Sequence, residues 1–190
     1  MNKLEINFIR HGMTAGNLEK RYIGRTDEPL CSEGFAALKV KNYPASGVLI
    51  CSPMKRCVQT AEVIFTGVEP LIYSGLRECD FGDFEGKNYL ELSGDPAYQR
   101  WIDSNGTAAF PGGESPDDFR ERCCAEFLRA VNEHNTVEKM TFIVHGGTIM
   151  SVMERFSVPK RSYYDWHCDN GCGFTVNYDS QSMMLISEIK

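Results

Sequence analysis

The sequence lacks long apolar runs, and this absence argues against one class of protein. Its first segment, MNKLEINFIRHG, already becomes polar at Asn7 and Arg10. A membrane span needs about 20 consecutive, mainly apolar residues. The segment also lacks the apolar stretch of a secretory signal peptide. We therefore expect a cytoplasmic protein that does not associate with membranes.

Positive charge is also scarce. The chain has 20 Lys and Arg residues against 26 Asp and Glu residues, which gives a formal net charge of −6. A surface with this balance repels nucleic acids and anionic membranes. No nucleic-acid partner is expected, and any site for an anion must be a local cluster of cations.

The eight cysteines lack the spacing of a metal or redox site. No C-x-x-C pair occurs among them, and they are scattered along the chain: Cys31, Cys51, Cys57, Cys79, Cys123, Cys124, Cys168 and Cys172. In a chain of this size without an export signal, such cysteines are typical of reduced thiols. His167 lies beside Cys168, but no second ligand pair is spaced to complete a zinc tetrahedron. We expect no metal and no cofactor.

The organisation of the chain is that of one α/β domain, residues 1–190. No internal repeat, low-complexity tract or linker is visible, and 42% of the residues are hydrophobic. Short apolar runs are followed by a turn and then by a helical pattern. This order is typical of β-α units with a mainly parallel sheet.

Three such junctions carry polar clusters. Strands are expected at 4–9, 48–51 and 140–144. The clusters that follow them contain Arg10 and His11, then Arg56, then His145. Ser52 and Pro53 have the pattern of an N-cap and first residue for the second helix, and the third helix is expected at 148–156. Ligands of open α/β sheets bind outside the carboxyl ends of the strands, so the clusters should converge there.

Two later segments complete the expected fold. Ser115 and Pro116 predict the start of a long helix, and Asn170-Gly171 predicts a turn before a strand at 174–178. The segment between Gly82 and Gly113 is rich in Gly, Asp, Asn and aromatic residues. Because a long connection in a compact domain is usually functional, we expect an insertion at 82–113 that covers the crevice as a lid. Tyr98 and Trp101 are expected to pack within it.

The residues of these clusters suit phosphoryl transfer. His11 has an ordinary pKa of about 6.5, so a neutral imidazole is available to attack phosphorus. A single histidine is also compatible with a purely structural role. Positive charge around the phosphoryl oxygens comes from Arg10, Arg56 and His145. Glu78 is the candidate acid for the leaving oxygen, and a surface acid or ion-pair partner is the alternative.

Five motifs in order then resemble a known family. They are FIRHGMTAGN at 8–17, SPMKRCVQTA at 52–61, LRE at 76–78 with FGDFEG at 81–86, PGGES at 111–115, and VHGG at 144–147. Their order and spacing resemble the histidine phosphatase superfamily, also called the phosphoglycerate mutase-like family. The resemblance extends over about residues 6–150.

The resemblance implies specific roles for residues of this chain. His11 becomes the phosphohistidine, and Glu78 serves as acid and then as base for water. The expected phosphate and substrate contacts are Arg10, Arg56, His145, Asn17, Thr14, Gly24 and Arg21. The resemblance also implies a three-layer sandwich, in which helices flank a mainly parallel sheet, and metal-independent catalysis.

The run at 21–30 looks most like the α-ribazole phosphatase and broad-specificity phosphatase branch. A small phosphorylated metabolite is therefore the expected partner, with α-ribazole 5′-phosphate as the substrate that the resemblance favours. A monomer or a homodimer is expected. A phosphoglycerate mutase-type transfer and a non-catalytic phosphate-binding module are the alternatives. Arg21 and Arg25 either hold a second anionic group or are solvated.

One departure from the family pattern concerns a helix cap. Cys31 stands where the family often has Thr or Ser at the start of the next helix. We expect Ser32 to provide the cap instead.

Overall fold

Six strands form a single sheet in the structure, a computed structural model that describes residues 3–190. Met1 and Asn2, part of the expected domain 1–190, lie outside the described residues. The sheet has the order β3-β2-β4-β1-β5-β6. The strands are β1 (Leu4–Arg10), β2 (Val48–Cys51), β3 (Leu71–Ile72), β4 (Lys139–Val144), β5 (Gly173–Tyr178) and β6 (Met183–Ile189). The first four strands pair in parallel, and β5 and β6 add two antiparallel pairs at one edge.

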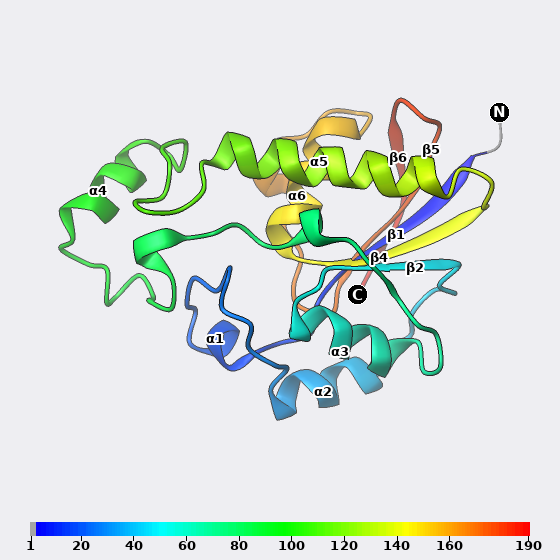
Figure 1. The fold of residues 1–190 in the computed structure, drawn as a ribbon, viewed down its shortest axis with the longest axis horizontal. Helices are drawn as coiled ribbons and strands as arrows, with labels where there is room; N and C mark the ends of the chain where they lie inside the picture. Colours follow the sequence, from blue (N-terminus) through cyan, green and yellow to red (C-terminus); the bar gives the residue numbers. More distant parts are fainter. Residues whose placement is uncertain (1–2) are drawn as a thin grey trace.

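Helices cover both faces of this sheet (Figure 1). They are α1 (Ala15–Leu18), α2 (Ser32–Lys39), α3 (Lys55–Ile64), α4 (Pro96–Asp103), α5 (Pro116–Glu133) and α6 (Gly146–Phe156), with short 3-10 turns η1 (Ser74–Leu76), η2 (Gly82–Phe84) and η3 (Tyr163–Trp166). Helices α5 and α6 lie on one side, and α2 and α3 on the other. The predicted α/β sandwich is confirmed. Within residues 3–190, no helix combines the length and apolar character that crossing a membrane requires.

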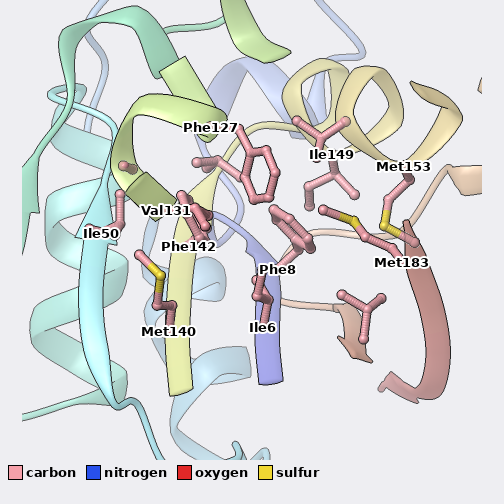
Figure 2. Close-up of a cluster of buried hydrophobic side chains, with 14 of the residues drawn as sticks. Ile6, Phe8, Ile50, Phe127, Val131, Met140, Phe142, Ile149, Met153 and Met183 are labelled. Atoms are coloured by element: carbon pink, nitrogen blue, oxygen red, sulfur yellow. The ribbon is translucent and has the colours of Figure 1, made fainter. Parts of the chain in front are cut away.

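The central strands are buried on both faces. On one face, Phe8 of β1 stacks on Phe142 of β4 with ring centroids 5.3 Å apart, and Phe127 of α5 packs against both rings (Figure 2). On the other face, Ile9 and Ile143 belong to the cluster that includes buried residues of α3. Alternate residues of a strand point to opposite faces, so each central strand is anchored from two sides. The residues that follow these strands therefore start from a rigid base.

The start of α5 agrees with the sequence pattern, whereas the start of α3 does not. The Ser115 hydroxyl accepts from the Asp118 amide at 3.1 Å, and Pro116 is the first residue of α5. Helix α3 begins at Lys55, so the prediction of Ser52 as its N-cap was wrong. The Ser52 hydroxyl lies 2.8 Å from His145 Nε2 instead. A carboxylate oxygen of Asp27, from a distant loop, accepts the Lys55 amide proton at 2.7 Å.

Two other helix starts also differ from expectation. Helix α6 begins at Gly146, two residues before the predicted start at Thr148. The cap of α2 is Cys31, whose Sγ accepts from the Gly34 amide at 3.3 Å, so the prediction of a Ser32 cap was wrong. Ser32 lies inside the helix, and its hydroxyl donates to Glu33. All eight cysteines are free thiols, as predicted.

The segment 82–113 packs around a small, mainly aromatic cluster that it shares with Phe119 and Cys123 of α5. Its helix α4 projects away from the sheet, at the left of Figure 1. Tyr98 and Trp101 of α4 are stacked with ring centroids 6.0 Å apart and planes inclined by 14°. Phe84, which precedes α4 in the chain, and Phe110, which follows it, both pack against Trp101. The aromatic residues of this segment therefore serve chiefly to hold it together.

Candidate active site

The parallel pairing of β1 and β4 brings two histidines together. Arg10 is opposite Val144 in the register, so His11 and His145 leave the sheet side by side at the carboxyl ends of the strands. Their ring centroids lie 5.2 Å apart. Both are buried, with 4% and 0% of their surface exposed. This pair forms the floor of the candidate site.

The hydrogen bonds of His11 determine its tautomer. Nδ1 lies 2.7 Å from the carbonyl oxygen of Gly12, and a carbonyl can only accept, so Nδ1 carries the proton. The lone pair of a neutral His11 is therefore on Nε2. Burial, together with the charges of Arg56 and Arg10, lowers the pKa of His11 well below its ordinary value. The ring is thus kept neutral, with a free nitrogen that can act as a nucleophile.

Arg56 is a buried cation with 1% exposure, and main-chain carbonyls fix its orientation. Nη1 donates to the Thr26 carbonyl at 2.8 Å, and Nη2 donates to the Gly24 carbonyl at 2.9 Å. Nε faces Nδ1 of His145 at 3.4 Å. Gly24, one of the predicted substrate-binding residues, thus contributes a carbonyl that orients Arg56.

His145 is held between Arg56 and Ser52. Because Arg56 Nε can only donate, Nδ1 of His145 accepts and its Nε2 donates to the Ser52 hydroxyl at 2.8 Å. Burial and the nearby charges of Arg56 and Arg10 lower the pKa of His145 well below its ordinary value. Sequence reasoning missed this contribution of Ser52, because the Ser-Pro pair resembles a helix start.

Arg10 leaves one donor of its guanidinium without a partner. Nη1 donates to the Cys168 carbonyl at 2.8 Å, which fixes the direction of the side chain. Nε is buried and has no hydrogen-bond partner among the described residues. A buried N–H without an acceptor is destabilising, and an anionic oxygen would satisfy it.

Glu78 lies where the loop after η1 meets the start of α6. Its Oε1 accepts from the Cys79 amide at 3.0 Å, and its Oε2 accepts from the Gly147 amide at 3.2 Å. Burial raises the pKa of Glu78, although these hydrogen bonds and the charges of Arg56 and Arg10 oppose the rise. A carboxyl with a raised pKa is suited to donate a proton. A side chain at 147 would collide with it, since a Cβ there would be 2.4 Å from Oε1.

Asn17 is joined to the site by a residue that sequence reasoning did not assign. Asn17 Oδ1 accepts from the Thr14 amide at 3.2 Å and from Asn170 Nδ2 at 3.1 Å. The amide nitrogen of Asn17 is therefore the part that is oriented to donate. Asn170 Nδ2 also donates to the His11 carbonyl at 3.0 Å. The Asn170-Gly171 turn thus supports both His11 and Asn17, and only the turn itself was visible in the sequence.

The other predicted binding residues have different surroundings. Thr14 is buried, caps α1 and donates its hydroxyl to Glu28 at 2.6 Å. Arg21 forms ion pairs with Glu19 and Glu91 at 2.5 and 2.6 Å. The structure therefore engages Arg21 with carboxylates and does not bring it into the cluster around His11. Arg25 lies 3.5 Å from Asp80.

A cavity of about 370 Å³ opens beside Arg10 and Glu78. Its walls include Arg120 and seven aromatic side chains: Tyr22, Phe81, Trp101, Phe110, Phe119, Tyr163 and Tyr164. Glu78 also borders a second cavity, of about 730 Å³, whose lining includes Arg77, Asp80 and Glu114. Within residues 3–190, no group of three or more His, Cys, Asp or Glu residues is arranged to hold a metal ion.

Comparison with known proteins places the chain in a family. The family model of the histidine phosphatase superfamily (branch 1) matches residues 6–187. Phosphoglycerate mutase-like protein 4 of Arabidopsis thaliana is 31% identical, over 80% of this chain and 70% of that protein. The adenosylcobalamin/alpha-ribazole phosphatase of Salmonella typhimurium is 26% identical, over 89% and 88%.

A solved structure extends the likeness to the fold. The alpha-ribazole phosphatase of Shigella flexneri has a TM-score of 0.86 at 22% identity and covers 98% of this chain and 96% of that one. At this identity the likeness concerns the fold alone. The family match over 6–187 carries the assignment and supports phosphatase activity. The chain belongs to the histidine phosphatase superfamily, branch 1.

Proposed function

We propose that this protein hydrolyses small phosphomonoesters through a phosphohistidine on His11. The observation that carries the proposal is the hydrogen bond from Nδ1 of His11 to the Gly12 carbonyl at 2.7 Å, which leaves the Nε2 lone pair free. Arg56 and Arg10 supply positive charge close to His11, and these charges contribute to lowering the pKa of its ring. A nucleophile among fixed cations is the arrangement that phosphoryl transfer requires.

The first step forms a bond between Nε2 of His11 and phosphorus and breaks the ester P–O bond. The departing oxygen takes the proton of Glu78, whose raised pKa favours the protonated form. The alcohol then leaves, and Glu78 remains as a carboxylate. Arg10, Arg56 and the Asn17 amide would bind the phosphoryl oxygens during this transfer, while His145, whose two ring nitrogens are engaged by Arg56 and Ser52, would orient Arg56.

The second step returns the enzyme to its starting state. The Glu78 carboxylate removes a proton from a water molecule as the water oxygen attacks phosphorus. The N–P bond breaks, its electrons return to Nε2 of His11, and phosphate leaves. Glu78 is then protonated again, so one group serves as acid and then as base.

We further propose a small aromatic phosphate ester as substrate, with α-ribazole 5′-phosphate as the specific candidate. The aromatic side chains of the cavity beside Glu78 support a leaving alcohol that carries an aromatic ring system. Two of the relatives, from Salmonella typhimurium and Shigella flexneri, are named as alpha-ribazole phosphatases. Residues of the chain supply the charge for phosphoryl transfer, so the proposed reaction needs no metal ion.

A mutase reaction is the second candidate, because one relative is named as phosphoglycerate mutase-like. In that reaction the bound product takes the phosphoryl group back before it leaves. Retention of labelled phosphate in an isomerised product, with little free phosphate, would favour it. Arg120 also lines the cavity and could pair with the carboxylate of a phosphoglycerate, so the labelled-phosphate test decides between the two reactions.

The cellular setting belongs to the same proposal. We place the protein in the cytoplasm with a small phosphorylated metabolite as its partner, since all eight cysteines are free thiols and reducing compartments maintain that state. Cell fractionation with an antibody against the chain tests the location.

The test of the activity is phosphate release from phenyl phosphate in excess chelator. We expect native protein to turn over and to hold acid-labile phosphate after rapid quenching in acid-free denaturant. His11→Ala should lose both signals, while Glu78→Ala should be slowed at both steps. Native protein that binds phosphate without turnover would contradict hydrolysis, and activity lost to the chelator would contradict metal independence.

A further inference from the structure

Glu114 and Arg122 form an ion pair outside the phosphate cluster, and the role assigned to them below rests on the proposed function of Glu78. Glu114 belongs to the PGGES motif before α5, and Arg122 lies on α5. We propose that this ion pair positions Glu78 for proton transfer by holding the main chain on both sides of it. The two residues are positioning residues, because neither contacts the Glu78 carboxylate.

The main chain around Glu78 depends on contacts from elsewhere. The 3-10 turn η1 ends at Leu76, and Arg77 has an extended conformation, with φ −62° and ψ 153°. Between Leu76 and the next turn, η2, no helix or strand hydrogen bonds fix the segment. The carboxylate of Glu78 is held by the amide of Cys79, so its position follows that of this main chain.

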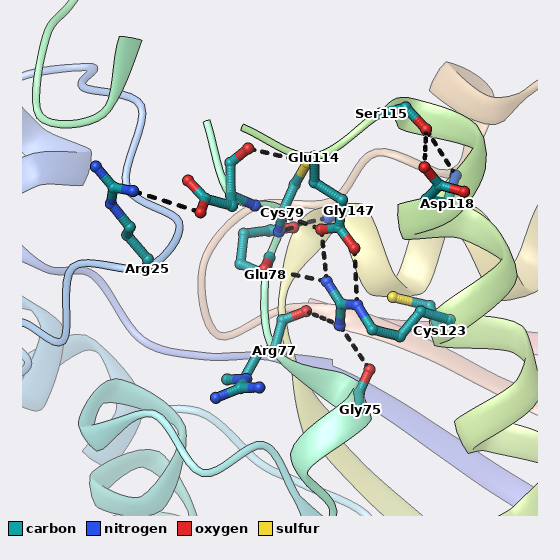
Figure 3. A network of polar contacts seen from close by, with 12 residues as sticks. Arg25, Gly75, Arg77, Glu78, Cys79, Glu114, Ser115, Asp118, Cys123 and Gly147 are labelled. Atoms are coloured by element: carbon teal, nitrogen blue, oxygen red, sulfur yellow. Dashed lines mark hydrogen bonds and ion pairs between the residues drawn. The ribbon is translucent and has the colours of Figure 1, made fainter. Parts of the chain in front are cut away.

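Arg122 supplies contacts on the amino-terminal side of Glu78. Figure 3 shows the polar network in which Gly75, Arg77, Glu78 and Glu114 lie. Its Nη1 donates to the carbonyls of Gly75 and Arg77 at 2.7 and 3.0 Å. Its Nη2 reaches the carbonyl of Glu78 itself at 3.5 Å. A planar guanidinium presents its donors in a rigid fork, so these carbonyls are held in a defined relation to one another.

Glu114 orients the guanidinium of Arg122 and also contacts the main chain on the carboxyl-terminal side of Glu78. Its two carboxylate oxygens accept from Nε and Nη2 of Arg122 at 2.9 and 2.7 Å. Its amide donates to the Asp80 carbonyl at 2.9 Å. The glycines of the motif allow the two loops to approach, since a Cβ on Gly113 would be 2.4 Å from the Asp80 carbonyl oxygen. The pair thus contacts the chain before and after Glu78.

The burial of this pair distinguishes it from the exposed ion pair that joins α5 to α6. The side chains of Arg122 and Glu114 are 30% and 20% exposed, whereas those of Arg155 and Glu121 are 49% and 66% exposed. Exposed pairs contribute little to stability and order little around them. Glu121, also on α5, therefore provides a matched control for Glu114.

The test uses two aryl esters that differ in their need for an acid. Phenyl phosphate has a poor leaving group that requires protonation, whereas p-nitrophenyl phosphate departs readily without it. We expect Glu114→Gln to slow phosphohistidine formation from phenyl phosphate about tenfold, because a misplaced acid transfers its proton poorly. The rate with p-nitrophenyl phosphate should change less than about twofold. Glu121→Gln should behave like native protein with both esters.

A second readout is independent of turnover. The pKa of the Glu78 carboxyl, followed by carbon-13 NMR, should fall towards its ordinary value in Glu114→Gln, because a displaced side chain loses the burial that raises it. Arg122→Lys, which keeps the charge and loses the fork, should produce both effects. Thermal melting of each variant confirms that it is folded.

The outcomes separate this inference from the proposed function. Equal slowing of both esters in Glu114→Gln, or an unchanged pKa of Glu78, would overturn the positioning role. A native protein that forms no phosphohistidine would instead refute the proposed function, and the NMR measurement would still decide whether the pair positions Glu78.

Discussion

The two ends of the site are built in different ways. At the phosphate end, His11, Arg56 and His145 are each less than 5% exposed and follow the central strands or lie on α3. At the other end, residues of short helical elements in the long connections, such as Trp101 of α4 and Tyr164 of η3, line a cavity, and Tyr164 is 66% exposed. The sheet thus fixes the groups that would perform the chemistry, and loops form the surface that would select the ester.

The electrostatic character of the two ends differs as well. Cations and neutral imidazoles are enclosed at the phosphate end, where burial lowers the pKa of both His11 and His145. The cavity has aromatic walls, with the carboxyl of Glu78 at the boundary between the two ends. Substitutions at the phosphate end should therefore affect the rate of the chemical step, and those in the cavity should affect substrate affinity.

The largest effect is expected from Arg56→Lys at the phosphate end. Lysine keeps the charge but cannot donate to the carbonyls of Gly24 and Thr26 while also facing His145. We expect kcat/KM to fall about 10² to 10³-fold. Steady-state hydrolysis of phenyl phosphate measures this change. Arg129→Lys on the exposed face of α5 is the control, and equal losses in both variants would contradict the assignment.

The boundary between the two ends is tested by Gly147→Ala. The new methyl group would be 2.4 Å from Glu78 Oε1 and 2.9 Å from the Phe119 ring, so the carboxylate must move. We expect kcat to fall on the order of 30-fold. If Gly147→Ala retained native kcat, the position of Glu78 would not matter for the rate.

The leaving-group end is tested by Trp101→Ala. Loss of the indole removes part of the cavity wall and its stacking on Tyr98. We expect KM for an aromatic ester to rise about tenfold with kcat nearly unchanged. Acetyl phosphate, which has no ring, should show no such change. A matching loss with acetyl phosphate would indicate that the tryptophan supports the phosphate end instead.

The buried histidines should also make stability depend on pH. Their folded-state pKa values lie below those of the unfolded chain, so the unfolded state binds more protons as pH falls. The free energy of unfolding should therefore decline below about pH 6.5, by up to about 1.4 kcal/mol per pH unit for each histidine. The raised pKa of Glu78 opposes this trend.

Urea unfolding between pH 8 and pH 5 measures this dependence. In His145→Asn the decline should be shallower than in native protein, because one of the two groups is gone. A His134→Asn variant, at the end of α5, serves as the control. An equal slope in His145→Asn and native protein would disagree with the burial of a neutral ring.

The smallest effect is expected for Arg21→Ala. The guanidinium is already paired with Glu19 and Glu91, so its loss should change KM and kcat less than about twofold. The same kinetic assay measures this. A large rise in KM would show that Arg21 leaves its carboxylates to bind substrate, as the sequence pattern predicted.

The comparison of the two ends also explains what could be predicted. Strands β1, β2, β4 and β5, the residues at their ends and the cap of α5 follow from local patterns, because hydrophobic periodicity and cap chemistry act over a few residues, whereas β3 and β6 were not predicted. Parallel pairing then dictates that Arg10 and Val144 are neighbours. The proximity of His11 and His145 could therefore be predicted from the sequence.

Other features were decided only when distant segments met. Ser52 has the pattern of a helix cap, yet its hydroxyl is hydrogen-bonded to His145. The first amide of α3, that of Lys55, donates to the Asp27 carboxylate instead. The contacts of Asn170 with His11 and of Arg122 with Gly75 join residues far apart in the chain. The sequence by itself determined which groups stand at the strand ends. The tertiary structure decided their tautomers, their burial and the shape of the cavity, because these depend on packing between segments that local patterns do not relate.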